Sequence, residues 1–191
     1  MTRAAVARVP ALFPPWTNTA TRVALIGAVV LGAGAVITPI AIARSPYATG
    51  QYDPLLQPIA FDHRHHVHDD GIPCLYCHDG AEKSPYAGIP PTERCMGCHA
   101  QVWNDSVAIA PLESSWRSNT PIRWQRVHSL PDFVYFDHSI HIARNVACAT
   151  CHGRVDEMAA VYQVEPLTMN WCLNCHRRLA PTRTTCSVCH R

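Results

Sequence analysis

Ten cysteines in this 191-residue chain form five pairs, each with the spacing C-x-x-C and each followed at once by histidine. Two thiols three positions apart can form thioethers with the two vinyl groups along one edge of a porphyrin, which brings the next residue beneath the iron. C-x-x-C-H is the attachment motif of c-type haem. The sequence therefore predicts five covalently attached haem c groups. The attached thiols would be Cys74, Cys77, Cys95, Cys98, Cys148, Cys151, Cys172, Cys175, Cys186 and Cys189, and the proximal iron ligands His78, His99, His152, His176 and His190.

Two other uses of paired cysteines fit this pattern less well. Disulfides are common in proteins outside the cytoplasm, and C-x-x-C pairs with histidine can also hold zinc. Neither use requires a histidine directly after every pair, and no cysteine of this chain is left outside a motif. Haem attachment is therefore the favoured interpretation.

A second motif supplies candidates for the opposite face of each iron. F-D-H-x-x-H occurs at residues 61–66 and again at residues 136–141. Two histidines three positions apart share one face of a helical turn, but their rings can reach different irons. Each copy is therefore predicted to join one haem to its neighbour through two distal ligands. These four ligands are His63, His66, His138 and His141.

The fifth distal ligand is open between two residues. His128 lies outside the histidine clusters and would bring the distal candidates to five. Met169 is the competitor, because a thioether is an accepted sixth ligand that raises the reduction potential of a haem. The remaining histidines, His65 and His68, are predicted to be solvated or to lie near haem propionates.

Five distal candidates for five irons leave no open coordination position. A cytochrome that converts nitrite or hydroxylamine needs an open iron, so no catalytic residue is predicted on this chain, and an enzymatic role would belong to its complex. The formal net charge of +2 and the lack of a long basic run argue against nucleic acid as a partner. Electron transfer is the function that these features favour.

Residues 23–43 contain no charged side chain and would span about 30 Å as a helix, enough to cross a bilayer. A cleaved signal sequence is the alternative, because Ala41 and Ala43 form an A-x-A pattern, but the apolar run and the polar lead are both longer than such signals have. The arginines before the span outnumber the one that closely follows it, which predicts a cytoplasmic N-terminus and a haem domain on the periplasmic face of the bacterial membrane. These arginines are Arg3, Arg8 and Arg22 before the span and Arg44 after it.

The part of the chain after the anchor offers about 30 residues per haem, too few for an ordinary side-chain core. We therefore expect the porphyrins to form the core of a mainly α fold with much irregular coil, to which the sixteen prolines also point. The predicted organisation is a cytoplasmic lead at 1–22, a transmembrane helix at 23–43, a connector at 44–60 and a pentahaem domain at 61–191, with modules at 61–99 and 136–176 and the fifth motif at 186–190.

The order of these features, and the stretches FDHRHHVHDDGIPCLYCH, VHSLPDFVYFDHSIH and VEPLTMNWCLNCHR, resemble the pentahaem cytochrome c subunit of bacterial alternative complex III, whose modules are similar to the class III multihaem cytochromes. The resemblance implies a respiratory or photosynthetic membrane complex that oxidises quinol and passes electrons to a soluble cytochrome c, a copper protein or a terminal oxidase. It also implies polytopic quinol-binding subunits, an iron–sulfur subunit and a monohaem cytochrome c as partners. In such a complex this chain would relay electrons.

A self-sufficient quinol dehydrogenase with a single span, feeding periplasmic reductases, is the alternative. Such proteins share the anchor and the number of haems, but their sequences look unlike the paired F-D-H-x-x-H modules. The predicted span also offers no ionisable residue for the proton relay that quinol chemistry needs.

Overall fold

The structure is a computed structural model that describes residues 13–190. Arg3 and Arg8, on which the predicted orientation of the anchor depends, lie outside the described residues, as do most of the lead at 1–22 and Arg191. The chain divides into two units, the first ending at Ala48 and the second beginning at Thr49.

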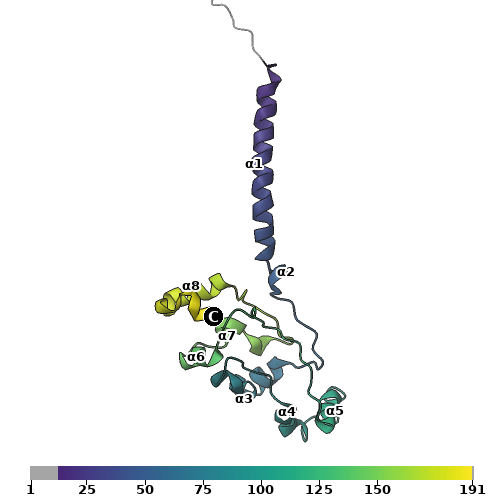
Figure 1. Cartoon of the computed structure of the whole chain (residues 1–191). Helices are drawn as coiled ribbons and strands as arrows, with labels where there is room; N and C mark the ends of the chain where they lie inside the picture. Colours follow the sequence, from purple (N-terminus) through teal and green to yellow (C-terminus); the bar gives the residue numbers. More distant parts are fainter. Residues whose placement is uncertain (1–12, 191) are drawn as a thin grey trace, which may run out of the picture. The chain divides into compact units, whose positions relative to one another are not determined.

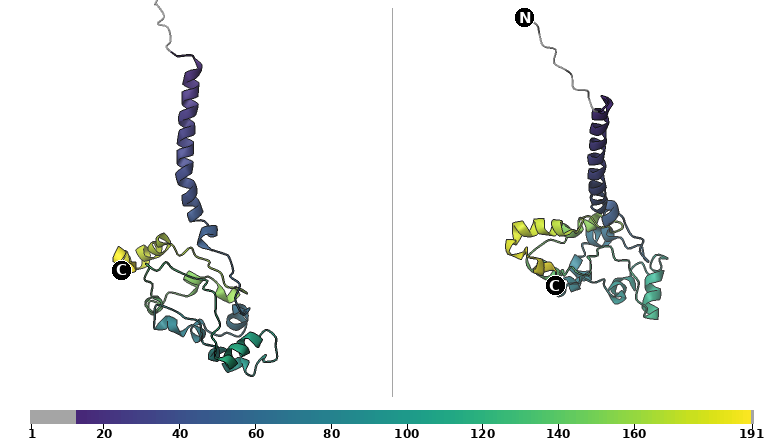
Figure 2. Two further views of the ribbon diagram at one scale, coloured as in Figure 1. Left: turned by 45° about the vertical axis from the view of Figure 1, so that its right-hand side comes forward. Right: turned by 45° about the horizontal axis from the view of Figure 1, so that its top comes forward.

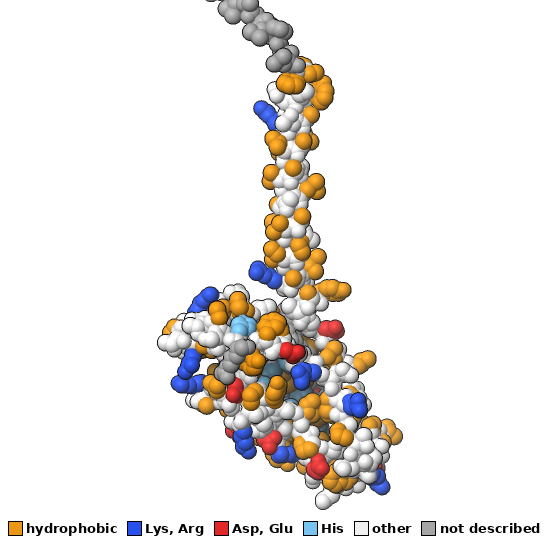
Figure 3. Space-filling view, viewed as in Figure 1, with side chains coloured by type: hydrophobic (Ala, Val, Ile, Leu, Met, Phe, Trp, Pro, Cys, Tyr) orange, Lys and Arg blue, Asp and Glu red, His pale blue; other side chains and the backbone are white. Residues whose placement is uncertain are grey.

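One long helix, α1 (Trp16–Ala43), makes up most of the first unit (Figure 1). Its 28 residues are long and apolar enough to cross a membrane, and hydrophobic side chains line it in Figure 3. It begins seven residues before the predicted start at 23, because the polar turn there is also helical and Thr17 donates a hydrogen bond to the carbonyl of Pro14 at 2.7 Å. The start of an apolar run in the sequence does not reveal a polar helical turn that precedes it.

The second unit consists of short helices joined by long stretches of coil (Figure 2). No strand occurs among residues 13–190. The β-type backbone pairing in this range is limited to an isolated bridge between Gln51 and Gln163. The predicted fold class, mainly α with much irregular coil, is confirmed. Helix α2 (Pro46–Thr49) lies at the boundary between the two units. The short helices of the second unit are η1 (Arg64–Asp69), α3 (Cys74–Cys77), η2 (Asp79–Glu82), α4 (Thr92–His99), α5 (Ala110–Ser118), α6 (His138–Ala143), α7 (Ala149–His152), η3 (Val155–Glu157), α8 (Met169–Leu179), η4 (Pro181–Arg183) and α9 (Cys186–Cys189).

Few side chains are buried in this unit. Among residues 13–190 the buried apolar side chains are Ala81, Ile109, Leu112 and Met158, and none of the large side chains is fully buried. A cavity of about 4730 Å³ occupies the place of a core and is lined by residues from all parts of the unit. A fold of this size with so few buried side chains lacks most of the hydrophobic stabilisation that ordinary domains obtain from their cores.

The two sequence modules interlock within the unit. Helix α6 of the second module packs on η2 of the first, and η1 of the first packs on η3 of the second. Helix α4 packs on α5, where the hydroxyls of Thr92 and Ser115 are hydrogen bonded at 3.1 Å. Residues 100–135, which join the modules, therefore pack against the first module through α5.

Candidate haem-binding sites

Each C-x-x-C-H motif is wound as one helical turn that brings its three functional side chains together. In sites 1, 3 and 5, numbered by the order of the motifs along the chain, the amide of the histidine donates to the carbonyl of the first cysteine at 2.9 to 3.0 Å. Site 2 forms the last turns of a longer helix, α4, and site 4 lies in the middle of another, α8. Side chains three and four positions apart on a helix share a face, so both thiols and the imidazole face the same way.

Burial raises the pKa of five of the ten thiols and so favours their neutral form; these are Cys74, Cys77, Cys95, Cys151 and Cys172. Burial, and after it the nearby thiols of Cys172 and Cys175, raise the pKa of Cys151 to about 11. Zinc binds thiolates in groups of three or four ligands, and no group of three or more histidine, cysteine or acidic side chains among residues 13–190 could hold a metal ion. All ten cysteines are also free of disulfides. This donor set does not match a zinc site or a disulfide framework.

Four of the five proximal histidines are oriented by a backbone carbonyl at Nδ1. These are His78 with Gly88 at 2.7 Å, His99 with Val102 at 3.1 Å, His176 with Arg183 at 2.8 Å and His190 with Phe133 at 2.9 Å. A carbonyl accepts only from a protonated nitrogen, so each ring keeps its proton on Nδ1 and leaves the lone pair of Nε2 free. A histidine that binds metal through Nε2 is typically held in this way.

The two F-D-H-x-x-H segments have the same local geometry. Phe61 meets His63 edge-on at 4.7 Å and stacks on His66 at 4.4 Å between ring centres. In the second segment, Phe136 meets His138 at 4.7 Å and stacks on His141 at 4.6 Å. Both second histidines direct Nδ1 at the carbonyl of the aspartate in the motif, at 3.0 and 2.8 Å. The sequence repeat is therefore a structural repeat.

Three of the predicted distal histidines face a proximal histidine across a nearly constant gap. The ring centres are 6.1 Å apart for His66 and His99, 6.1 Å for His141 and His176, and 6.3 Å for His138 and His152. Two bonds of about 2 Å from opposite nitrogens to one metal, plus the distance from each nitrogen to its ring centre, give about 6 Å. These gaps fit an iron between two imidazoles.

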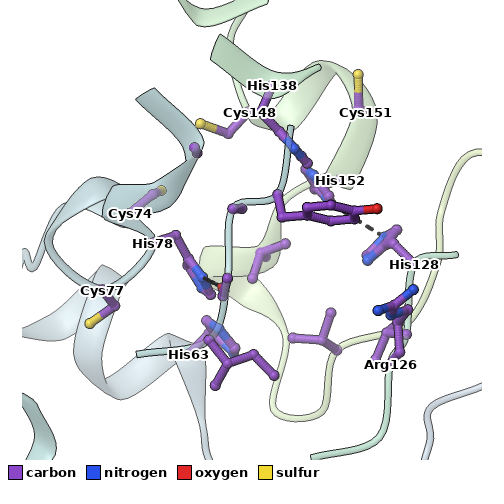
Figure 4. A pocket seen from close by; sticks show the side chains of 18 of the residues that line it. His63, Cys74, Cys77, His78, Arg126, His128, His138, Cys148, Cys151 and His152 are labelled. Carbon is purple, nitrogen blue, oxygen red and sulfur yellow. Dashed lines mark hydrogen bonds between the residues drawn. The ribbon is translucent and has the colours of Figure 1, made fainter. Parts of the chain in front are cut away.

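His63 lies in a comparable environment beside His78. Burial, and after it the nearby His78, lower the pKa of His63 to about 4. Its Nδ1 is the buried side-chain polar atom without a hydrogen-bond partner in the described part of the chain. Figure 4 shows both rings at the wall of the large cavity, with Cys74 and Cys77 of the same motif beside them.

The large cavity has room for five porphyrins. Divided by five, it provides about 950 Å³ per site, near the upper end of the roughly 300 to 1,000 Å³ that ligand pockets span. Its lining includes nine of the ten motif cysteines and the side chains of all four distal candidates. Haem groups in it would supply the buried core that the side chains do not.

The comparisons with known proteins agree with this geometry. The family described as "Cytochrome c7 and related cytochrome c" matches residues 134–191, which include motifs 3, 4 and 5. The chain carries a multihaem cytochrome c domain. It is also 28% identical over 161 residues to the "Menaquinone reductase, multiheme cytochrome c subunit" of Nitratidesulfovibrio vulgaris (strain Hildenborough), an alignment that covers 71% of this chain and 77% of that one.

In this cytochrome domain the two candidates for the fifth distal ligand, and the spare histidine His65, are placed differently from the four histidines of the F-D-H-x-x-H segments. His128 lies beside the proximal His152, with ring centres 4.4 Å apart and a contact of 3.4 Å between its Nε2 and Nδ1 of His152. Met169 begins α8, and its side chain is 66% exposed. His65 is exposed and lies 3.6 and 3.8 Å from Asp69 and Asp70. The assignment of the fifth distal ligand stays a prediction.

Neighbouring thiols show that the sites of the cytochrome domain are not arranged in sequence order. Burial raises the pKa of Cys95, and the thiol of Cys77 beside it adds to the rise, so sites 1 and 2 are neighbours. Burial also raises the pKa of Cys74, with Cys148 as a hydrogen-bonded neighbour that adds to the rise, so site 1 adjoins site 3. Figure 4 shows Cys74 and Cys148 on facing turns.

The second module continues this row. The thiol of Cys151 in site 3 has both cysteines of site 4 as neighbours. Burial raises the pKa of Cys172 in site 4, and Cys189 of site 5 adds to this rise. The attachment sites therefore follow one another in the order 2, 1, 3, 4, 5, which no feature of the sequence had indicated.

Proposed function

We propose that the chain attaches five haem c groups, one per motif, and that each of the first four sites is closed by two histidines. The observation that carries this proposal is the repeated gap of about 6 Å between facing imidazoles. The pairs would be His78 with His63, His99 with His66, His152 with His138 and His176 with His141. Closed sites of this kind bind no substrate and leave electron transfer as the function.

The order of the sites supports a one-dimensional relay. Haem c supplies one-electron iron chemistry, and the protein contributes spacing, ligands and burial. Each H-x-x-H segment spans two sites of its own module, while the contact between Cys74 and Cys148 joins the modules. Electrons would therefore enter or leave at sites 2 and 5, the two ends of the row.

We further propose that helix α1 anchors this relay in the bacterial cytoplasmic membrane, with the haem domain on the periplasmic face. Residues 23–43 contain no ionisable side chain, so the helix provides no proton relay, and quinone chemistry would take place in polytopic partner subunits. The resemblance to alternative complex III favours quinol oxidation, with electrons passed through the row to a periplasmic carrier or a terminal oxidase.

The opposite direction of electron flow is the second candidate. The related chain from Nitratidesulfovibrio vulgaris is a subunit of a menaquinone reductase. In a complex of that type the same row would deliver electrons to the quinone site. Both candidates make the chain a relay within a quinone-linked membrane complex.

Purification of the native complex from membranes tests the proposal. We expect polytopic subunits to co-purify with the chain, and a quinol to reduce its haems in the complex but not in the isolated chain. Quinol oxidation by the isolated chain would instead favour the self-sufficient dehydrogenase. Menaquinone reduction at the expense of the reduced haems, without net quinol oxidation, would favour the second candidate.

A further inference from the structure

We propose that His128 is a positioning residue for site 3: it accepts a hydrogen bond from His152 and does not bind an iron. The proposal rests on the proposed attachment of haem at that site. It replaces the role of fifth distal ligand with a role in orienting and tuning a proximal ligand.

The spacing of the rings excludes His128 as the second ligand of an iron bound by His152. The ring centres of His128 and His152 are 4.4 Å apart with planes at 81°, whereas the three pairs that fit an iron are separated by 6.1 to 6.3 Å. Two metal bonds of about 2 Å cannot be placed within 4.4 Å once the radii of both rings are included. His128 and His152 are therefore too close to hold an iron between them.

The nitrogen atoms in contact give the direction of the hydrogen bond. His152 meets His128 through Nδ1, the atom that the other four proximal histidines direct at a backbone carbonyl. If Nε2 of His152 binds iron, Nδ1 must carry the proton and donate it. Nε2 of His128 is then the acceptor, at 3.4 Å, and would approach more closely when the iron fixes the ring of His152.

The structural repeat already supplies a distal ligand for site 3. His138 corresponds to His63, because both meet the phenylalanine of their motif at 4.7 Å and nearly at right angles. His63 lies beside the proximal histidine of the first motif of its module, and His138 faces His152, the proximal histidine of the first motif of the second module, at 6.3 Å. Site 3 therefore has both axial ligands without His128.

A ring nitrogen and a carbonyl oxygen act differently on the imidazole that donates to them. A stronger acceptor leaves more negative charge on the donating ring, and a more basic ligand stabilises ferric over ferrous iron. His152 is the one proximal histidine whose Nδ1 meets a side chain, and site 3 is the middle of the row. His128 would thus hold the potential of the central haem below the value that a carbonyl would give.

Substitution of His128 in the full chain with its haems attached separates the possible roles. His128→Leu removes the acceptor, and His128→Gln keeps an oxygen that can accept the hydrogen bond but does not replace an imidazole on iron. We expect both variants to retain the low-spin spectrum of the wild type. The midpoint potential of one haem should rise in His128→Leu and return toward the wild-type value in His128→Gln. His138→Leu is the control, because it should convert one haem to high spin.

Two results would overturn the inference. Conversion of one haem to high spin in His128→Gln would show that His128 binds iron, and this variant decides the question even if His128→Leu does not fold. Unchanged potentials of all haems in His128→Leu would show that the hydrogen bond does not act on site 3. Absence of covalent haem from the wild-type chain would be a different failure, that of the proposed function, and would be seen before any variant is made.

Discussion

The modules 61–99 and 136–176 place their distal histidines almost identically but support them with different neighbours. The phenylalanine contacts agree to within 0.2 Å between the two copies, and both aspartate carbonyls orient the second histidine. The repeated residues F-D-H-x-x-H are thus sufficient for the local arrangement. Positions outside the motif determine what surrounds it.

The aspartate side chains show the first difference. Asp137 accepts from the backbone amide and the hydroxyl of Ser139, and α6 follows as a regular helix. Asp62 accepts from the backbone amide and the guanidinium of Arg64, and the following turn, η1, is a π-helix. The residue after the first histidine of the motif is arginine in the first module and serine in the second. This difference changes the hydrogen-bond partner of the motif's aspartate.

The hydrogen bonds of the proposed iron ligands show the second difference. Nδ1 of His138 is directed at the carbonyl of Pro85 in the other module, at 2.6 Å, whereas Nδ1 of His63 is unpartnered. His78 is oriented by the carbonyl of Gly88, and His152 by the side chain of His128. Since partners of metal-bound histidines tune the metal, we expect equivalent sites of the two modules to differ in potential although their ligands are the same.

The largest expected effect comes from removal of a corresponding distal ligand in each module. His63→Ala and His138→Ala should each convert one haem from low to high spin and open it to carbon monoxide, because each takes one axial imidazole from an iron. Absorption and electron paramagnetic resonance spectra measure the change. His65→Ala is the matched control and should leave the spectra unchanged. If only one of the two variants alters a haem, the modules do not share their ligand scheme.

The fifth site has no counterpart in this comparison and depends on a different residue. With His128 beside His152, Met169 is the candidate that remains for the iron attached at site 5. Met169→Ala should then raise the high-spin content by one haem and lower the potential of that haem, because a thioether raises it. Met169→Leu tests whether packing alone is involved. Silent spectra in both variants would place the fifth ligand elsewhere.

A smaller effect is expected where the modules differ directly after the proximal histidine. Gly153 follows His152 with φ of 69° and ψ of −165°, a region that essentially only glycine adopts, and an added Cβ would lie 2.7 Å from Cγ2 of Val164. Gly153→Ala should cost about 1 to 3 kcal/mol of stability, measured by chemical unfolding with haem attached. Asp79→Ala, at the corresponding position of the first module, should cost less than about 0.5 kcal/mol. Equal losses would contradict this difference.

The smallest expected effect concerns the cap of α6. The hydrogen bond from the Ser139 hydroxyl, and then those from the backbone amides, lower the pKa of Asp137. Its carboxylate therefore contributes stability that is fully present above the ordinary value of 3.8 and is lost as the pH falls through the lowered value. Asp137→Ala should lower the melting temperature slightly at neutral pH, and the difference from the wild type should vanish in acid. A difference that persists in acid would show that the cap is not electrostatic.

The sequence indicated the chemistry of the sites better than their arrangement. The motif C-x-x-C-H reports bonding that is local, so the thiols and proximal histidines could be predicted from it, and the long apolar run predicted most of α1. The order 2, 1, 3, 4, 5 depends on contacts such as that between Cys74 and Cys148, which are far apart in the chain. Contacts between residues that are far apart in the chain leave no periodic pattern in the sequence from which they could be predicted.

The position of His128 could not be predicted for a related reason. Counting histidines matched five distal candidates to five irons, but it gave no information on which rings lie 4.4 Å apart and which lie 6 Å apart. The sequence repeat could have indicated this, because His63 and His138 occupy the same position of the motif and are therefore expected to bind equivalent irons in the two modules. Applied to site 3, that equivalence would already have favoured His138 over His128 as the second ligand of that site.

Electron transfer by this chain requires covalent attachment of haem to all ten thiols. Intact-mass spectrometry of the full chain, purified from a host that matures c-type cytochromes, tests it most directly, together with an iron assay on the same sample. We expect the mass of the polypeptide plus five haems, and five irons per chain. A mass without added porphyrin, or zinc in place of iron, would contradict it.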